Sequence, residues 1–247
     1  EIMPSLVGSE MCIRDRENAV KPIEPVFLDF KKDMSQLTAK SDIPVLYKQN
    51  TTNDLFQLIY VFDMGNNNDK ALGTAFDYLE YLGTSDMTPE ELKSEFYRLA
   101  CTFYVSPGNE RTYVVLSGLN ENMPAAIQLF EKLLADAQVN KEAYDNLVGD
   151  ILKARADAKL NQGQNFSRLM NYAMYGPKSP ATNLLTEAEL ASMNPQELVD
   201  RIHNQNNYKH RILYYGPSSS KDLLATIDQY HQVPATLKDI PTGNEFS

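Results

Sequence analysis

The sequence predicts an α+β fold in which a largely antiparallel sheet has helices packed on one face. Three observations lead to this prediction. Short segments rich in β-branched and aromatic residues occur in the first half of the chain and again near its end. Between them lie longer segments whose apolar residues recur every three to four positions, as in amphipathic helices. Strand pairs alternate with pairs of helices, and no segment of about 20 to 50 residues repeats itself, so helices layered on a sheet are favoured.

The first pair of strands is predicted at residues 44–49 and 54–64. The polar segment 51–53 separates the two apolar runs, and such a short connection indicates an antiparallel hairpin. In the second strand the residues at every other position are apolar, and this set is expected to face the core. The set consists of Phe56, Leu58, Tyr60 and Phe62.

A second hairpin is predicted from the apolar runs 102–106 and 111–117. The sequence Pro-Gly-Asn at 107–109 supplies the turn between them. A last strand is expected at 210–215, where a Gly-Pro pair follows the apolar run. These segments complete the predicted sheet.

Helices are predicted wherever apolar residues recur at helical spacing, and several begin at a residue that can cap them. Thr88 and Glu91 form a capping box, with Pro89 in the first helical position. Thr186 and Glu189 form a second box. The predicted helices span residues 69–82, 88–101, 121–138, 141–160, 165–175, 186–191, 195–204 and 220–231.

The apolar stripe of each helix is expected to pack on the sheet. Phe76 and Leu79 represent this stripe in the first helix, and Cys101 is expected to pack as a small hydrophobic side chain. The long helix over 141–160 is expected to use four residues for this contact. These are Leu147, Ile151, Ala154 and Ala158.

Composition and charge argue against several classes of protein. The 247 residues include 33 acidic and 23 basic side chains, which gives a net charge of −10. No basic surface is available to displace counterions from phosphates, so no nucleic acid is expected as a partner, and a polybasic membrane-surface protein is disfavoured. No apolar run reaches the roughly 20 residues of a membrane span. Two cysteines are too few for a disulfide framework.

The two ends of the chain differ from its centre. Residues 1–16 have no regular apolar period, and the run SLVGSEMCIRD resembles a translated sequencing-adapter read-through; the alternative is a disordered native leader. We therefore expect residues 1–20 to be an unstructured leader that arose as an artefact. Residues 21–233 are expected to form one α+β domain, and the polar stretch 234–247 a linker towards a missing following domain. The chain is thus expected to be a fragment of a longer protein.

Common catalytic motifs do not occur in the sequence. It has no Gly-x-Ser-x-Gly nucleophile elbow and no glycine-rich loop that ends in Gly-Lys-Ser/Thr. The run Gly-Pro-Ser-Ser-Ser at 216–220 precedes a helix and is expected to be a turn with a serine cap rather than an anion site. His203, His210 and His231 have no second ligand three or four residues away. Each is therefore expected to stabilise a helix end or to face solvent.

One segment carries a more specific signal. Helical spacing places Asp77, Glu80 and Tyr81 on one face of the first helix. Two histidines at such spacing, with a glutamate beside them, would bind zinc and activate water. The run DYLEY at 77–81, with Gly-Thr at 83–84, resembles the inverted zinc motif His-x-x-Glu-His of the insulinase-type (pitrilysin, M16) metallopeptidases. Only Glu80 keeps the residue type of that family, and Asp77 and Tyr81 replace the two histidine ligands.

The resemblance extends over residues 21–233. It is carried by the strand end FDMG and by the runs YVVLSGLNENMPAAIQLFEKLL, NYAMYGPKSP and HRILYYGP. The chain is similar to one domain from the C-terminal half of a long, four-domain member of the family. This resemblance implies an α/β roll. It also implies a zinc-binding N-terminal half, with glutamate as general base, that closes with a degenerate C-terminal half around an unfolded peptide.

The function implied by the resemblance is that of a non-catalytic, substrate-enclosing domain of an insulinase-like zinc metallopeptidase that degrades peptides. The chain alone is predicted to be inactive, with no catalytic or metal-ligating residue, and its substrate-binding residues are not assigned. Zinc is expected in the missing N-terminal half, which is an implied partner together with peptide substrates. Bacterial relatives are often periplasmic, which favours that compartment. The alternative is a stand-alone non-catalytic subunit that partners a separate catalytic chain, similar to the core proteins of respiratory complexes.

Overall fold

The computed structural model describes residues 25, 27 and 29–246, so the predicted leader over residues 1–20 lies outside the described residues. The chain divides into two units, of which the first ends at Asp33 and includes the short helix α2 (Phe30–Asp33). The second unit begins at Met34 and holds the sheet and the remaining helices. The following paragraphs describe this second unit.

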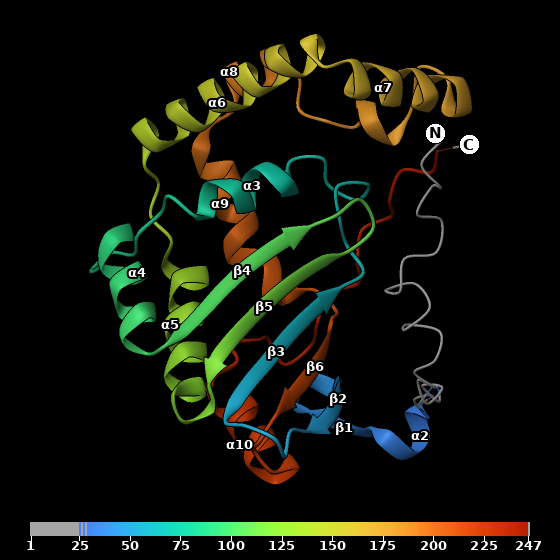
Figure 1. Cartoon of the computed structure of the whole chain (residues 1–247). Helices are drawn as coiled ribbons and strands as arrows, with labels where there is room; N and C mark the ends of the chain where they lie inside the picture. The colour runs from blue at the N-terminus through green and yellow to red at the C-terminus, as the bar shows by residue number, and fades with distance from the viewer. Residues whose placement is uncertain (1–24, 26, 28, 247) are drawn as a thin grey trace, which may run out of the picture. The chain divides into compact units, whose positions relative to one another are not determined.

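Six strands form a single sheet (Figure 1). They are β1 (Ser35–Ala39), β2 (Ile43–Gln49), β3 (Leu55–Phe62), β4 (Cys101–Pro107), β5 (Thr112–Leu119) and β6 (Arg211–Gly216). Their order across the sheet is β1-β2-β6-β3-β5-β4, so β1 and β4 are the two edges. Only the pair β2 and β6 is parallel, and the other four neighbouring pairs are antiparallel. The prediction of a largely antiparallel sheet is confirmed.

The helices follow the predicted segments closely. They are α3 (Leu72–Leu79), α4 (Pro89–Arg98), α5 (Met123–Asp136), α6 (Lys141–Leu160), α7 (Gln162–Tyr175), α8 (Glu187–Ser192), α9 (Pro195–Asn204) and α10 (Ser220–Tyr230). Both predicted capping boxes are present, at Thr88 and at Thr186. Short 3-10 turns complete the chain at η1 (Lys40–Asp42), η2 (Asn120–Asn122), η3 (Pro180–Thr182) and η4 (Gln205–Asn207). No helix of the described part of the chain is long and apolar enough to cross a membrane.

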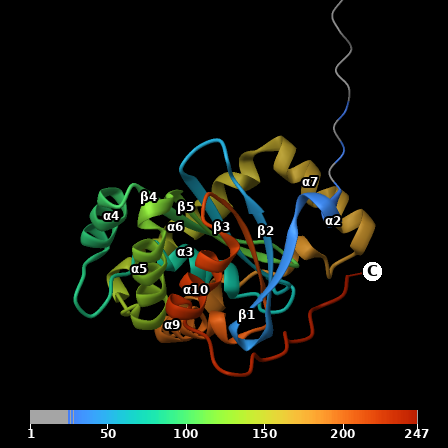
Figure 2. The same ribbon diagram turned by 90° about the horizontal axis from the view of Figure 1, so that it is seen from below.

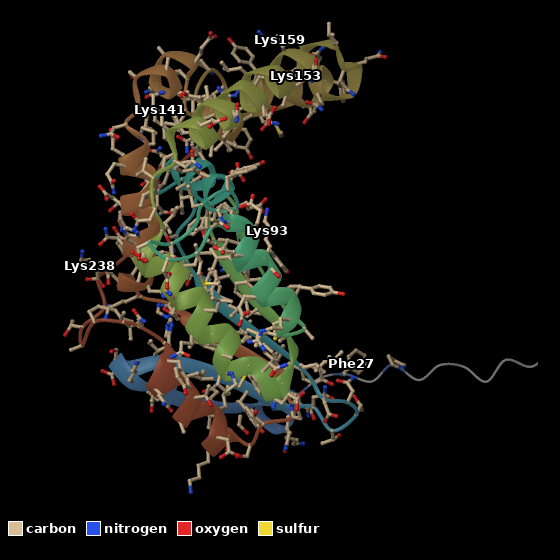
Figure 3. All side chains as sticks on the ribbon, turned by 90° about the vertical axis from the view of Figure 1, so that its left-hand side faces the viewer. Phe27, Lys93, Lys141, Lys153, Lys159 and Lys238 are labelled. Atoms are coloured by element: carbon tan, nitrogen blue, oxygen red, sulfur yellow. The ribbon has the colours of Figure 1, made fainter. Side chains whose placement is uncertain are left out.

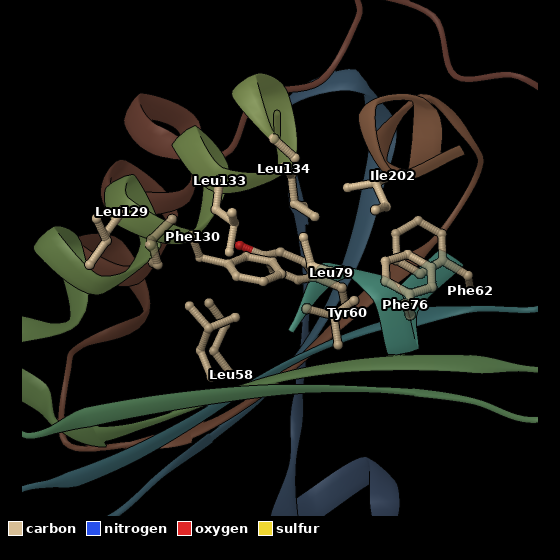
Figure 4. Packing of buried hydrophobic residues seen from close by; sticks show 14 of the residues in the cluster. Leu58, Tyr60, Phe62, Phe76, Leu79, Leu129, Phe130, Leu133, Leu134 and Ile202 are labelled. Carbon is tan, nitrogen blue, oxygen red and sulfur yellow. The ribbon is translucent and has the colours of Figure 1, made fainter. Parts of the chain in front are cut away.

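The core lies between one face of the sheet and the helices α3, α5, α9 and α10 (Figure 2). The four alternating residues predicted to face inward on β3, from Phe56 to Phe62, are all buried there. Figure 4 shows Phe130 of α5 and Leu79 of α3 beside Leu58 and Tyr60 of β3. Burial of these apolar side chains is the main source of stability for such a layer.

The opposite face of the sheet remains open. Its side chains include Leu55, Tyr104, Tyr113 and Tyr215, which are all exposed although they are large and apolar or aromatic. In Figure 1 the strands β3, β4 and β5 lie in front of the helices. The helices therefore pack on one face of the sheet, as predicted.

The predicted hairpin of β2 and β3 is wrong. Strand β6 lies between them, parallel to β2 and antiparallel to β3. Adjacent strands are about 4.8 Å apart, so the short segment between β2 and β3 has to cross about 10 Å. Asn50 supports this crossing, because its N–H donates to the carbonyl oxygen of Gly216 on β6 at 2.8 Å. The edge strand β1 was not predicted, because its sequence, Ser-Gln-Leu-Thr-Ala, has few apolar residues.

The helices α6 and α7 extend away from the core (Figure 3, where Lys153 and Lys159 mark α6). Leu147 is buried and Ile151 is half-buried, as expected, but Ala154 is exposed and Ala158 is only half-buried. The prediction that the apolar stripe continues along the whole of α6 is therefore wrong. The helix outruns the sheet, so its second half has α7 rather than the core as its neighbour.

Candidate functional site

A groove of about 690 Å³ lies between α3, α4 and the edge strand β4. Its apolar wall is formed by Phe76, Leu79 and Leu82 from the α3 side, Leu92 and Phe96 from α4, and Phe103 from β4. The ring centroids of Phe96 and Phe103 are 4.9 Å apart, which ties α4 to the edge strand. The groove is therefore apolar and runs along an edge of the sheet.

Local contacts fix the two helices that wall the groove. The hydroxyl of Tyr78 on α3 donates to the carbonyl oxygen of Asn140 at 2.6 Å and accepts from the N–H of Asn140 at 2.9 Å. Tyr78 is fully buried, so these two bonds anchor α3 to the start of α6. The loop to α4 packs tightly at Gly83, where a Cβ atom would lie 2.3 Å from the carbonyl oxygen of Met87. Only glycine fits at that position.

The edge strand presents free backbone groups along the groove. Leu119 N donates to the carbonyl oxygen of Ala100 at one end of the β4–β5 pair, and Gly108 N donates to that of Arg111 at the other. In an antiparallel pair only every second residue bonds to the neighbouring strand, and the two bonds above show that the even-numbered residues of β4 do so. The N–H and C=O groups of Phe103 and Val105 therefore point away from β5. An unpaired edge of this kind can accept a further strand.

The rim of the groove carries polar and aromatic side chains. Glu80 lies at the end of α3, and Lys93 projects from α4 (Figure 3). Tyr97 on α4 is 87% exposed, and Tyr104 on β4 is also exposed. Opposite charges on two helices and two exposed phenol rings therefore flank the apolar wall.

The residues of the zinc-like motif do not converge on one point. Asp77 lies in the last turn of α3, Glu80 is the residue at its C-terminal cap, and Tyr81 follows in a turn. All three side chains are exposed, and only Glu80 lines the groove. Atoms packed around Asp77 raise the pKa of its carboxyl, and the charge of Glu80 raises it further.

These residues do not fit a zinc ion. Within residues 29–246, no group of three or more His, Cys, Asp or Glu side chains is placed to hold a metal. Zinc sites in proteins are built from three or four converging nitrogen, sulfur or oxygen ligands. Glu80 thus has the position of the general base in the motif without ligands beside it.

Cys101 lines the groove as a buried side chain. Its side chain is 2% exposed, and burial raises the pKa of the thiol. A raised thiol pKa lowers the fraction of thiolate, which is the nucleophilic form. The expectation that Cys101 packs as a small hydrophobic residue is confirmed.

The expectation for two of the three histidines is wrong. His210 and His231 are buried, and their Nε2 atoms are 2.9 Å apart. Nδ1 of His231 contacts Oε1 of the buried Glu131 at 2.6 Å. Sequence spacing missed this cluster because its members lie on separate elements. The one available signal was the carboxylate of Glu131 within the apolar stripe of α5, four residues after Ile127.

The other two predictions about local chemistry hold. His203 lies in the last turn of α9, where its Nε2 is 3.1 Å from the carbonyl oxygen of Ala137. Ser219 caps α10 by accepting from the N–H of Asp222 at 3.1 Å. The run at 216–220 is therefore a strand-to-helix turn with a serine cap.

The six-stranded sheet with helices packed on one face is similar to the fold of solved M16 peptidase domains. Comparison with protein-family models and with curated protein sequences finds no match. Among solved structures, the periplasmic protease PqqL from Escherichia coli matches with a TM-score of 0.75 and 15% identity. An M16 peptidase inactive domain from Pseudomonas fluorescens matches with a TM-score of 0.71 and 16% identity. The ferredoxin protease FusC, solved in complex with Arabidopsis ferredoxin, matches with a TM-score of 0.73 and 11% identity.

The matches cover most of this chain but only part of each relative. They span 90% of this chain and 25% of PqqL or of FusC, and 87% of this chain and 54% of the Pseudomonas structure. At this level of identity the likeness concerns the fold. The fold implied by the resemblance in the sequence is thereby confirmed.

Proposed function

We propose that this chain is a non-catalytic, substrate-enclosing domain of an insulinase-like zinc metallopeptidase, and that it holds extended peptides in the groove beside β4. The groove is the observation that carries the proposal. It combines the outward-facing backbone of Phe103 and Val105 with an apolar wall. The fold is shared with peptidase domains, among them one described as inactive.

A peptide in this groove would bind by strand addition. Its backbone would pair with β4, which provides affinity without demanding a particular sequence. Every other side chain of the peptide would point towards the apolar wall formed by residues such as Leu92 and Phe96. Large apolar side chains are therefore favoured at alternate positions, while the side chains between them point to the open face of the sheet, beside Tyr104.

Peptide cleavage is assigned to a companion half. The residues around Glu80 do not fit zinc, so an ion bound in the companion half would supply the activated water. This chain contributes binding and orientation of the peptide backbone. Periplasmic localisation belongs to the same proposal and is supported by the description of PqqL as a periplasmic protease.

Strand addition can be tested with one substitution and its matched control. Val105→Pro removes an outward N–H from β4, whereas Val105→Ala keeps it and loses a similar amount of packing. The probe is a fluorescein-labelled ten-residue peptide in which Phe or Leu alternates with Lys or Ser. Fluorescence anisotropy is expected to show binding that is about five- to ten-fold weaker for Val105→Pro than for Val105→Ala, the effect of one lost hydrogen bond.

A second measurement leaves the protein unchanged. Two versions of the peptide carry N-methyl groups on alternate backbone nitrogens, in the two possible registers. One register blocks pairing with β4, and the other leaves its hydrogen bonds intact. A clear difference in affinity between the two supports strand addition. Equal affinities, together with equal binding by the two Val105 variants, contradict it.

A further inference from the structure

Three titratable side chains form a buried chain of hydrogen bonds away from the groove. Nε2 of His210 is 2.9 Å from Nε2 of His231, and Nδ1 of His231 is 2.6 Å from Oε1 of Glu131. Their exposed fractions are 7%, 0% and 1% for His210, His231 and Glu131. The peptide groove uses none of them, so their presence in the core requires another explanation.

The hydrogen-bond partners determine where the protons lie. Nδ1 of His210 is 2.8 Å from the carbonyl oxygen of Tyr208, which can only accept, so the proton of His210 is on Nδ1. Nε2 of His210 must then accept, and His231 donates to it from Nε2. One further proton lies between Nδ1 of His231 and the carboxylate of Glu131. With these three protons, His210, His231 and Glu131 together carry no net charge.

The surroundings leave no place for an additional proton. Glu131 Oε2 accepts from Nδ2 of Asn206 at 2.8 Å and from the backbone N–H of Gln232 at 3.2 Å. On the other side, the rings of Tyr60 and Phe62 on β3 cover the two imidazoles. Burial, and secondly the neighbouring His231, lower the pKa of His210 to about 4.

This chain of side chains joins two backbone segments to the core. The segment 205–210 leads into β6, and the segment 231–240 follows α10. They lie side by side, because Lys238 N donates to the carbonyl oxygen of Asn207 at 2.7 Å and Lys209 N donates to that of Lys238 at 2.9 Å. The His210–His231 bond connects the same two segments through their side chains.

Buried polar atoms without hydrogen-bond partners destabilise the packing of segment 205–210. Both amide atoms of the Gln205 side chain and Oδ1 of Asn206 are buried without a hydrogen-bond partner among the described residues. Unpaired polar atoms in the interior favour local opening, because water satisfies them once the segment separates.

A cavity beside His210 provides an outward path. It has a volume of about 680 Å³, and charged side chains line it together with Ser41. These charged side chains are Asp42, Asp63, Asp239, Lys209 and Arg211. Asp63 is paired with arginines and Asp239 with Lys209, whereas Asp42 makes no ion pair within the described ranges. An imidazolium that turns outward would therefore meet an unpaired carboxylate.

We propose that the His210–His231–Glu131 chain is an acid-sensitive latch. Protonation of His210 on Nε2 replaces the acceptor of the imidazole–imidazole bond with a donor, so the bond breaks. Segments 205–210 and 231–240, which this bond joins, then separate from each other, and this pair of segments is the local unit that opens. The latch therefore couples pH to the packing of residues 231–240 against the segment that leads into β6.

The direction of the pH effect follows from linkage. In the open unit His210 has an ordinary pKa near 6.5, whereas in the closed unit its pKa is about 4. The open unit therefore binds more protons, so opening is favoured as the pH falls below about 6.5 and levels off below about 4. Between pH 8 and pH 5 the opening equilibrium is expected to rise about thirty-fold.

Hydrogen exchange of the whole chain tests the latch. Exchange is measured at pH 8 and pH 5, and each rate is divided by the intrinsic rate at that pH. The corrected rates of amides in 205–210 and 231–240 are expected to rise about thirty-fold at pH 5, while those of β3 stay unchanged. His210→Gln removes the titrating ring and is expected to abolish the rise. His203→Gln is the matched control, because His203 is not bonded to His210, His231 or Glu131. This variant should retain the rise.

Two outcomes overturn the proposal. One is a rise below about three-fold in the unsubstituted chain, and the other is a full rise in His210→Gln. If circular dichroism shows that His210→Gln does not fold, the decision passes to ¹⁵N NMR of the unsubstituted chain at pH 8. The Nδ1–H tautomer of His210 supports the latch, and the Nε2–H tautomer contradicts it.

Discussion

Tyr81 illustrates how single residues prevent metal binding on α3. A phenol is a poor substitute for an imidazole, because protein zinc sites are built from Cys, His, Asp and Glu side chains. The geometry adds to this effect, because Tyr81 N donates to the carbonyl oxygen of Tyr78, three residues back rather than four. The turn after Leu79 is therefore tightened, and Asp77 and Tyr81 do not share the spacing of a regular helix.

The chain is expected to hold no zinc. Purified protein is equilibrated with a small excess of zinc, dialysed, and analysed by mass spectrometry for metal per chain. Substantially less than one zinc per chain is expected, since no set of ligands converges near Glu80. One tightly held zinc per chain would contradict the assignment of a non-catalytic domain. A companion His-x-x-Glu-His peptidase domain, treated in the same way, is the positive control.

The sequence predicted single residues well where the signal was local and poorly where it was not. The capping residues Thr88 and Thr186 bond to amides three positions away, so the pattern alone was sufficient. The contact of His210 with His231 depends on the packing of β6 against α10. Neither residue carries a local mark of that contact, and both were expected at helix ends or in solvent. Glu131, the third member, was also missed.

Helices and strands were also predicted well where the signal was local. The sequence predicted that a strand exists more reliably than it predicted which strand pairs with it. Most helices have an apolar stripe, and several have a capping residue, and both features are fixed by residues within one or two turns. The partner of β2 is β6, far along the chain, and nothing in residues 43–49 distinguishes that partner from β3. The sequence also did not show that α6 extends beyond the core, because a stripe of alanines fits either a buried or an exposed face.

The packing of α3 on the sheet can be measured with two phenylalanines. Phe76 on α3 is 3% exposed and Phe166 on α7 is 62% exposed. Phe76→Ala is expected to lower the free energy of unfolding by about 3–5 kcal/mol, because it removes a buried ring and leaves a cavity. Phe166→Ala is expected to change it by less than about 0.5 kcal/mol. Urea denaturation gives both values, and equal losses would show that the burial assigned to α3 is wrong.

At the scale of the whole molecule, charge and the open sheet face act together. The net charge of −10 produces a negative field that attracts basic peptides over distances of several ångströms. The groove and the open face together offer aromatic surface from Tyr97 and Tyr104. Long-range attraction and short-range apolar contact are therefore separable contributions to peptide binding.

Salt dependence is expected to separate these contributions. Two peptides with the same apolar residues, one with lysine and one with glutamate at the alternate positions, are compared by anisotropy. The lysine peptide should bind more tightly in low salt, and the difference should nearly vanish at about 1 M salt, where the Debye length is about 3 Å. A serine peptide without charge is the control and should be nearly insensitive to salt. Equal affinities of the charged peptides in low salt would contradict the electrostatic contribution.

The position of β6 in the middle of the sheet has a consequence for how the chain folds during synthesis. A nascent chain that has emerged only as far as α9 holds two separate groups of strands, β1–β2 and β3–β5–β4. Each group has an unpaired edge where β6 will lie, and such edges attract other strands. Pairing between Val45 and Ile212, and between Ile59 and Leu213, joins residues far apart in sequence, which is slow compared with helix formation. The ribosome therefore releases last the strand that joins the two groups, and until then the nascent domain depends on protection from aggregation.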